Sequence, residues 1–324
     1  MTEPSVVVLS GGVGGAKLTL GLDRILPAGA LTAVINTGDD FYHLGLCICP
    51  DIDTTLYTLS GLADRNKGWG RGDESWGFMA ALGQLGGDTW FQLGDRDLAL
   101  HVLRSRALAR GERLSAFTAD MAQRLGITSR ILPMSDDPVA TEVETSDGTL
   151  PFQEYFVRHQ CRPRVRALSY RGADHARPAP GVLDALAAPD LEAVVIAPSN
   201  PYLSIDPILA VPGIREALAA TAAPVIAVTP VIGGSAVKGP TTKIMAELRL
   251  SPSARTIADH YRNLIDGFLL DERDKTLLEA MPVATRVADT LMVSLEDRER
   301  VAGAVLSFAR HLGRRPGGRR TSST

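Results

Sequence analysis

A glycine-rich segment near the start of the chain constrains the fold more than any other feature. Ser10-Gly-Gly-Val-Gly-Gly-Ala-Lys17 follows a short apolar run at residues 6–9, and apolar residues at helical spacing continue through residues 16–26. A second apolar run, residues 31–35, ends in polar residues. This order of strand, glycine loop, helix and strand predicts a βαβ unit with parallel strands and a right-handed crossover.

The second half of the chain repeats this pattern. Residues 193–197 run into Pro198-Ser-Asn-Pro201, and residues 224–228 run into Pro230-Val-Ile-Gly-Gly-Ser235. A short helix is predicted between them, over residues 213–220. In open α/β sheets the turns at the carboxyl ends of the strands form the ligand crevice. We therefore expect the glycine segment and these two turns to meet at one edge of a parallel sheet.

The middle of the chain differs from both halves. Helical periodicities at residues 76–85, 97–109 and 115–125 precede short apolar runs within residues 131–157, where Asp147-Gly148 is typical of a hairpin turn. This segment reads as an insertion that is mainly helical.

Together these patterns predict an α/β fold in a single enzyme unit over residues 1–312. Its Rossmann-like parallel-sheet core comes from about residues 1–60 and 160–312, and the inserted middle lobe from about residues 61–159. The basic, glycine-rich residues 313–324 predict a disordered tail.

The bulk composition is that of an ordinary enzyme. A formal net charge of −3, with acidic and basic residues interspersed, gives no electrostatic case for a nucleic-acid partner. Cys47, Cys49 and Cys161 form no CxxC motif and no disulfide framework, which favours a reducing compartment. No signal peptide or run of 18 apolar residues is evident, so we expect a cytoplasmic protein without membrane association.

The glycine segment is suited to holding phosphate. Its backbone amides, with the amino terminus of the following helix, can bind an anion without any side chain. It is not a Walker A loop, because Gly-Lys-Ser/Thr is absent. It also fits the dinucleotide fingerprint poorly, since Lys17 stands at the third glycine position and Asn36, rather than an acid, ends the second strand.

An acidic segment follows the second strand. Asn36-Thr-Gly-Asp-Asp40 and Cys49-Pro-Asp-Ile-Asp-Thr54 carry four carboxylates, Asp39, Asp40, Asp51 and Asp53. Mg²⁺ prefers one or two carboxylates together with waters and phosphate oxygens, so this segment predicts a magnesium site. For Asp39 and Asp51, capping of turns and helices explains the sequence equally well.

Two further segments combine glycine, tryptophan and charge: Gly68-Trp-Gly-Arg-Gly-Asp-Glu-Ser-Trp76 and Trp90-Phe-Gln-Leu-Gly-Asp-Arg-Asp97. This composition suits a flat aromatic ligand held at its polar edge, although structural packing of the tryptophans competes at even odds. The six histidines show no HxxxH or other ligand spacing, which favours structural roles.

At this point the ordered motifs resemble those of the 2-phospho-L-lactate transferases of coenzyme F-420 biosynthesis, called CofD in archaea and FbiA in actinobacteria. The resemblance covers about residues 5–295. Besides the segments above, it is carried by Leu132-Pro-Met-Ser-Asp-Asp-Pro138, Phe152-Gln-Glu154, Ala197-Pro-Ser-Asn-Pro201, Ser204-Ile-Asp-Pro-Ile-Leu209, Val231-Ile-Gly-Gly234, Lys238-Gly-Pro240 and Asp271-Glu-Arg-Asp274.

The resemblance implies a Rossmann-like core, a Mg²⁺ cofactor and one reaction. Members of this family transfer a phospho-lactyl-type group from a guanosine diphosphate conjugate to the ribityl hydroxyl of Fo (8-hydroxy-5-deazariboflavin) and release GMP. Relatives differ in whether the transferred acid is lactyl, enolpyruvyl or glyceryl, and no residue of this sequence discriminates among the three. We expect the enolpyruvyl or lactyl conjugate, small-molecule partners only, and a homodimer.

The resemblance also assigns roles to individual positions. The catalytic residues and the metal ligands would be Asp40 and Asp53, and contacts with Fo would come from Asp53, Gln92 and Trp76. Gln92 departs from the Lys of archaeal relatives, and Asp206 stands where relatives often have Gly. The donor nucleotide and its phosphates would be held by residues of the glycine-rich turns: Gly11, Gly12, Gly14, Gly15, Lys17, Ser199, Asn200, Gly233 and Gly234. Lys17 or Lys238 would meet the carboxylate of the transferred group.

Two alternatives remain at this stage. A nucleotide-sugar-binding regulatory protein such as YvcK shares the glycine loop and core, but needs neither catalytic acids nor an Fo site. A nicotinamide-dependent oxidoreductase lacks support because the fingerprint residues are missing. The acidic Pro-Asp-Ile-Asp segment and the aromatic middle lobe favour the transferase.

Overall fold

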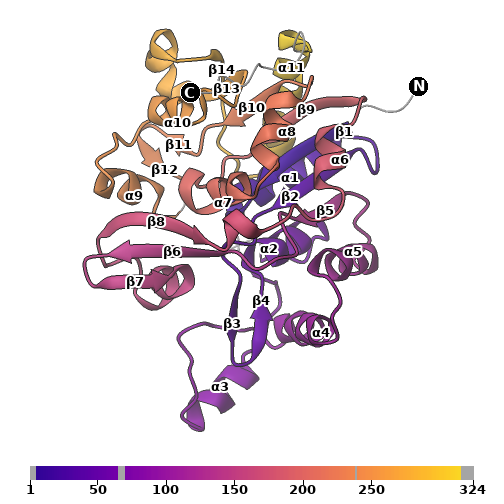
Figure 1. Ribbon diagram of the computed structural model, residues 1–324, viewed down its shortest axis with the longest axis vertical. Coiled ribbons are helices and arrows are strands. Elements are labelled where there is room, and N and C mark those ends of the chain that lie inside the picture. The colour runs from indigo at the N-terminus through magenta and orange to yellow at the C-terminus, as the bar shows by residue number, and fades with distance from the viewer. Residues whose placement is uncertain (1–4, 65–69, 238, 315–324) are drawn as a thin grey trace.

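The structure is a computed structural model that describes residues 5–64, 70–237 and 239–314. Within these residues, seven parallel strands form the central sheet (Figure 1). The strands lie in the order β14 (Ala284–Ala288), β13 (Gly267–Asp271), β10 (Val225–Val228), β9 (Leu191–Ile196), β1 (Ser5–Ser10), β2 (Leu31–Ile35) and β5 (Arg130–Pro133). From β1 the chain adds β2 and β5 toward one edge of the sheet. It then returns to β9, beside β1, and adds the remaining strands toward the other edge. The strand order therefore reverses between β1 and β9, which is where open α/β sheets bind ligands.

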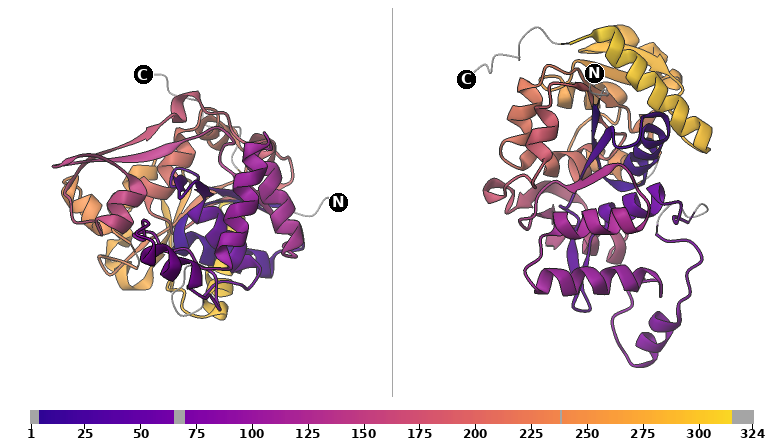
Figure 2. Two further views of the ribbon diagram at one scale, coloured as in Figure 1. Left: turned by 90° about the horizontal axis from the view of Figure 1, so that it is seen from below. Right: turned by 90° about the vertical axis from the view of Figure 1, so that its right-hand side faces the viewer.

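The sheet is covered on both faces, which explains why its strands are continuously apolar. Along β1, Val6 and Val8 enter one core while Val7 and Leu9 enter the other. The first core is completed by α1 (Gly12–Ile25), α2 (Pro50–Leu59), α5 (Leu114–Arg124) and α11 (Leu295–Leu312), with α11 alongside α1 (Figure 2). The second is completed by α6 (Val182–Leu186), α7 (Asp206–Ala210), α8 (Ile214–Ala220), α9 (Thr241–Glu247) and α10 (Ala254–Tyr261).

Smaller elements surround the carboxyl ends of the strands. The hairpin β3 (Phe41–His43)–β4 (Leu46–Ile48) and the helices α3 (Gly77–Gln84) and α4 (Asp97–Ala109) form a lobe that projects beyond the sheet (Figures 1 and 2). An antiparallel sheet is formed by β7 (Gly148–Pro151), β6 (Ala140–Thr145) and β8 (Val165–Arg171). The remaining pieces are the hairpin β11 (Val231–Ile232)–β12 (Ser235–Ala236), the π-helices η1 (Glu154–Arg158) and η3 (Pro201–Ile205), and the 3₁₀-helices η2 (Ala173–His175) and η4 (Glu272–Ala280).

The predicted Rossmann-like parallel-sheet core is confirmed, but the boundaries of the insertion need correction. Strand β5 lies inside the predicted insertion of residues 61–159, yet it pairs with β2 at the edge of the central sheet. Its side chains Ile131 and Leu132 are buried there. Conversely, β8 lies in the nominal core but pairs with β6. A short apolar run does not reveal which sheet it joins, because that depends on its partner strand. Of the predicted tail, residues 315–324 lie outside the described residues.

Candidate active site

A cavity of about 640 Å³ opens at the carboxyl ends of the strands, beside the point where the strand order reverses. That volume is in the range of sites that bury a drug-sized ligand. The cavity is lined by the glycine segment, by the turns after β9 and β10, by the start of α2, and by aromatic residues from the projecting lobe and from η1. The turns that the sequence predicted to converge therefore do so.

The glycine segment packs tightly against the turn after β9. The Gly11 amide donates to Ser199 Oγ (3.2 Å), and the Ser199 hydroxyl donates back to the Gly11 carbonyl (2.7 Å). A Cβ on Gly14 would lie 2.5 Å from the Pro198 carbonyl oxygen, and one on Gly15 would lie 2.5 Å from Ser199 Oγ. Backbone approach this close excludes any side chain, so these two glycines hold the two turns together.

Not every amide of the glycine segment is available to an anion. The Gly12 amide donates to Asp51 Oδ1 (2.8 Å), and Gly11 is satisfied by Ser199. Helix α1 begins at Gly12, earlier than predicted, so Val13 and Gly14 belong to its first turn. The N–H groups of a first turn have no partner within their helix. Gly11, Gly12 and Gly14 line the cavity, as do Val13 and Lys17.

Asp39 and Asp51 form a pair of buried carboxyls at the cavity wall, next to the glycine segment. Asp51 also accepts from Asn36 Nδ2 (2.9 Å), and burial raises its pKa to about 6. Burial and the nearby charge of Asp51 raise the pKa of Asp39 well above its usual range. Among the described residues, Asp39 Oδ1 has no hydrogen-bond partner. In the part of the chain that the structure describes, neither carboxyl forms an ion pair, and a bound cation would compensate for their burial.

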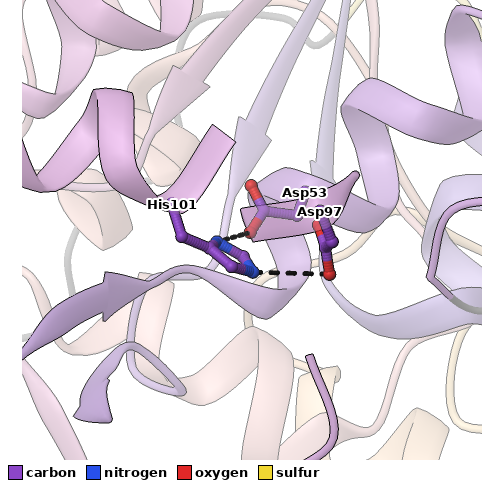
Figure 3. Close-up of side chains that lie close together, drawn as sticks. All are labelled: Asp53, Asp97 and His101. Carbon is purple, nitrogen blue, oxygen red and sulfur yellow. Dashed lines mark ion pairs between the residues drawn. The ribbon is translucent and has the colours of Figure 1, made fainter. Parts of the chain in front are cut away.

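Asp53 and Asp97 form a second acidic pair with His101 between them (Figure 3), and here the Arg104 guanidinium is a cationic partner. Arg104, which is fully buried, donates to both oxygens of Asp53, with a distance of 3.1 Å from Nη1 to Oδ2. His101 lies between the two carboxyls, its Nδ1 3.6 Å from Asp53 Oδ2 and its Nε2 3.3 Å from Asp97 Oδ2. The Tyr57 hydroxyl donates to Asp97 Oδ1.

The pKa values of this second pair move in opposite directions. Burial raises the pKa of Asp53, and the charge of Arg104 opposes that rise. Burial would also raise the pKa of Asp97, but its contacts with His101 and Tyr57 lower it overall. The pKa of Arg104 is raised by the surrounding acids, although burial opposes this, so its guanidinium stays charged.

Several predicted site residues lie away from the cavity. The Asp40 carboxyl is buried beside the Cys49 thiol, and burial raises its pKa well above the usual range. Trp76 precedes α3 with 36% of its surface exposed. Gly233 and Gly234 form the turn between β11 and β12, where the Gly233 amide donates to Asp274 Oδ2 (2.8 Å). Their neighbours Ile232 and Val237 line the cavity instead, and Lys238 lies outside the described residues.

Gln92, Lys17, Ser199 and Asn200 do line the cavity. The Gln92 amide donates to the Thr89 carbonyl (2.7 Å), and Lys17 Nζ donates to the Met292 carbonyl (2.7 Å). Asn200 Oδ1 accepts the first amides of η3, while its Nδ2 is buried with no hydrogen-bond partner among the described residues.

Two charged residues of the tryptophan-containing segments have a structural role that the sequence did not reveal. Glu74 accepts the backbone amides of Arg96 and Asp97, at the amino terminus of α4 (2.8 and 2.9 Å). Asp95 accepts those of Gly77 and Phe78, at the amino terminus of α3 (2.9 and 3.0 Å). Glu74 thus caps α4, and Asp95 caps α3. The bonds from Glu74 fix the residue at which α4 begins.

Comparison with known proteins identifies the family of this chain. The family model described as 2-phospho-L-lactate transferase CofD matches residues 6–304. The chain belongs to the CofD family. It is 43% identical to the "Phosphoenolpyruvate transferase" of Kitasatospora aureofaciens, over 94% of this chain and 97% of that protein. It is 38% identical to the "2-phospho-L-lactate transferase" of Methanosarcina mazei, over 93% and 99%. This chain is therefore a transferase of the CofD family.

A solved structure supports the fold alone. The protein BH3568 of Bacillus halodurans, described as a member of the UPF0052 family, matches with a TM-score of 0.63 and 19% identity, over 94% of this chain and all of that one. None of the helices in the described ranges combines the length and the apolar character that a bilayer crossing needs.

In this CofD-family chain, some of the cavity residues that sequence reasoning missed are aromatic and others belong to α4. Phe152 and Phe156 stack with ring centroids 5.3 Å apart, and the Arg158 guanidinium lies 6.0 Å from the ring of Trp90. Asp97 and His101 have the i, i+4 spacing that places two side chains on one helix face, and this was the available signal. His101, interpreted as structural, lines the cavity.

Proposed function

We propose that this transferase moves a phosphoenolpyruvyl or phospho-lactyl group from a guanosine diphosphate conjugate to the ribityl hydroxyl of Fo, with release of GMP, in coenzyme F-420 biosynthesis. The observation that carries the proposal is one continuous cavity that joins a glycine segment, buried carboxyls and an aromatic wall. Phosphoryl transfer needs positioning and charge neutralisation more than covalent help, and these surfaces supply both. Relatives at 40–43% identity carry the names phosphoenolpyruvate transferase and 2-phospho-L-lactate transferase, which supports an enolpyruvyl or lactyl donor.

The donor is assigned to the glycine side of the cavity. The first turn of α1 offers the amides of Val13 and Gly14 to the diphosphate, together with the positive end of the helix dipole. Asn200, whose Nδ2 lacks a partner among the described residues, is placed to donate to the nucleotide. Lys17, at the same wall, can meet the carboxylate of the transferred acid.

A Mg²⁺ ion fits the same side of the cavity. Asp39 and Asp51 would hold it, because both line the cavity and the buried Oδ1 of Asp39 lacks a partner among the described residues. When bound, the ion would neutralise charge on the diphosphate oxygens. The assignment of Asp40 and Asp53 as Mg²⁺ ligands stays a prediction from the sequence. Asp53, Asp97 and His101 have ligand atoms within 4.8 Å of one another, but Arg104 already neutralises Asp53, and Asp40 does not line the cavity.

The deazaflavin ring is assigned to the aromatic wall formed by Trp90, Phe91, Phe152 and Phe156. Flat rings gain from offset or edge contacts with such side chains. Gln92, at the same wall, is placed to meet the polar edge of the ring. This retains the predicted lobe for Fo but replaces Trp76 with Trp90 as the tryptophan that contacts it.

The ribityl hydroxyl would then lie near Asp53. Its oxygen attacks the phosphorus of the transferred group, the bond from that phosphorus to the GMP oxygen breaks, and the hydroxyl proton passes to a carboxylate. Asp53 is the predicted acceptor of that proton, and its place at the cavity wall is compatible with this role.

Turnover with defined substrates tests the proposal. The enzyme is incubated with Fo, Mg²⁺ and each of the three guanosine diphosphate conjugates, and the products are identified by mass spectrometry. We expect GMP and a phosphorylated Fo derivative, fastest with the enolpyruvyl or lactyl donor. The adenosine analogue of the best donor is the matched control and should react more slowly. The absence of GMP with every donor would rule the proposal out.

Other expectations stay predictions. These are a homodimer, a cytoplasmic location, and substrates that are small molecules rather than nucleic acids or membranes. Light scattering of the purified chain measures the oligomeric state directly, and a monomer at micromolar concentration would contradict the first of them.

A further inference from the structure

His101 is the centre of a five-residue network that joins two helices at the cavity wall, and Figure 3 shows His101 with its two carboxyls. Tyr57 and Asp53 are four residues apart on α2, while Asp97, His101 and Arg104 lie at i, i+4 and i+7 on α4. Both spacings place side chains on one face of a helix, so the two faces meet along a row of polar groups. His101 is the member that contacts both carboxyls.

The proton on the His101 ring can be placed from its neighbours. Arg104 Nη1 lies 3.4 Å from His101 Nδ1, and a guanidinium can only donate. Nδ1 is therefore the acceptor of this contact, which in a neutral ring puts the hydrogen on Nε2. That nitrogen faces Asp97 Oδ2 at 3.3 Å. Arg104 thus donates to His101, and Tyr57 donates to Oδ1 of Asp97. His101 Nε2 has no hydrogen-bond partner among the described residues, so it meets Asp97 Oδ2 as a close polar contact.

This arrangement does more than hold the fold together. The Asp53 carboxyl and the Arg104 guanidinium are buried together beside the partly buried Asp97, and buried ion pairs are weak evidence for stability because desolvation offsets their attraction. Apolar side chains of similar volume could join the two helices at no greater cost. Four of the five residues (Tyr57, Asp53, Asp97 and His101) line the cavity, so the network faces the substrates.

We propose that His101 is a positioning residue for the transfer reaction: anchored by Asp97, it holds the Arg104 guanidinium and the Asp53 carboxylate in the orientation that meets the acceptor hydroxyl. The proposal rests on the proposed function. The step that it affects is the approach of the hydroxyl oxygen to phosphorus, so the role should affect kcat more than substrate binding. A displacement of about 1 Å at a reacting group can cost on the order of a hundredfold in rate.

Two substitutions separate the two sides of the ring. His101→Asn places an amide where Nδ1 lies and can still meet Arg104 and Asp53. His101→Gln reaches the place of Nε2 and retains only the contact with Asp97. We expect kcat to fall about tenfold to a hundredfold in H101Q, with KM for Fo within about threefold of wild type, and to fall less in H101N. His260→Asn is the matched control, since His260 pairs with Asp206 (2.9 Å) but does not line the cavity.

The outcomes are separable. Wild type without GMP release would refute the proposed function, whereas active wild type and H101Q with kcat within about twofold of it would overturn the positioning role. Equal loss of activity in H101Q and H260N would also overturn it, because the effect would then reflect folding.

A spectroscopic measurement on the wild-type protein keeps the proposal testable if the variants do not fold. Ring ¹⁵N chemical shifts of labelled histidine should give a His101 with its proton on Nε2, and Asp97→Asn should change them. A His101 that carries its proton on Nδ1 alone would contradict the arrangement from which the role is inferred.

Discussion

Removal of the Arg104 guanidinium should destabilise the protein more than any surface substitution. Arg104→Met keeps most of the side-chain volume but leaves the Asp53 carboxylate, 7% exposed, without its cationic partner. Two charge-assisted hydrogen bonds at roughly 1.5–3 kcal/mol each are lost, and breaking a buried ion pair typically costs about 3–5 kcal/mol. We therefore expect the free energy of unfolding to fall by about 3–5 kcal/mol, measured by urea denaturation at pH 7.

The control for this variant is Arg124→Met. Arg124 also pairs with an aspartate, Asp120 at 2.9 Å, but its side chain is 69% exposed, so no measurable change is expected. The double variant Asp53→Asn/Arg104→Met removes both charges and should recover about half of the loss or more. A loss below about 1 kcal/mol in Arg104→Met, or a double variant less stable than Arg104→Met alone, would refute the reasoning.

The pH dependence of Arg104→Met has a definite sign. Without the guanidinium, burial raises the folded-state pKa of Asp53 further, because the main opposing charge is gone and only the influence of His101 still lowers it. The folded state then binds more protons than the unfolded state in the interval above the usual aspartate pKa. The deficit in unfolding free energy should therefore grow as the pH rises through that interval, and be smallest at about pH 4–5. A deficit that shrinks as the pH rises would contradict this.

Three other predictions concern the substrates. Asp53→Asn should abolish turnover without changing the circular dichroism spectrum, and activity within about tenfold of wild type would argue against its role. Mg²⁺ affinity, measured by calorimetry, should fall as the pH is lowered through about 6, because Asp51 must be deprotonated to bind the ion; a flat profile from pH 5 to 8 would exclude Asp51 as a ligand. Trp90→Ala should raise the Kd for Fo about twofold to tenfold, the equivalent of roughly 0.5–1.5 kcal/mol of aromatic contact, whereas Trp76→Ala should leave the Kd unchanged. A larger rise in Kd for Trp76→Ala than for Trp90→Ala would instead support Trp76 as the contact with Fo.

The sequence predicted the fold well because each element carries its own signal. Strand β2 and helix α4 have the predicted boundaries, since an apolar run and a 3.6-residue periodicity are properties of the local sequence. The convergence of the glycine segment with the turn after β9 also followed, because carboxyl ends of parallel strands share one edge. The edge strand β5 was misplaced, because its four residues reveal a strand but not the sheet that it joins.

The site was less accessible from the sequence because it depends on where individual side chains point. Asp39 and Asp40 are adjacent, yet only Asp39 lines the cavity. Which of the two side chains faces the cavity depends on the turn that the hydrogen bond from the Asp40 amide to the Thr37 carbonyl closes. A charged residue on the buried face of an amphipathic helix, as Arg104 is on α4, was a readable signal. Its partner on another helix could not be read, because pairing across fifty residues is a property of the packed chain.

Single-turnover stoichiometry tests the central claim most directly. With enzyme in excess over a guanosine diphosphate donor, in the presence of Fo and Mg²⁺, the quenched mixture is separated and GMP and phosphorylated Fo are quantified together. We expect one GMP for each molecule of phosphorylated Fo, and no GMP when Fo is omitted. Release of GMP at the same rate without Fo, or binding of the donor with no release at all, would contradict the assignment of this cavity to group transfer.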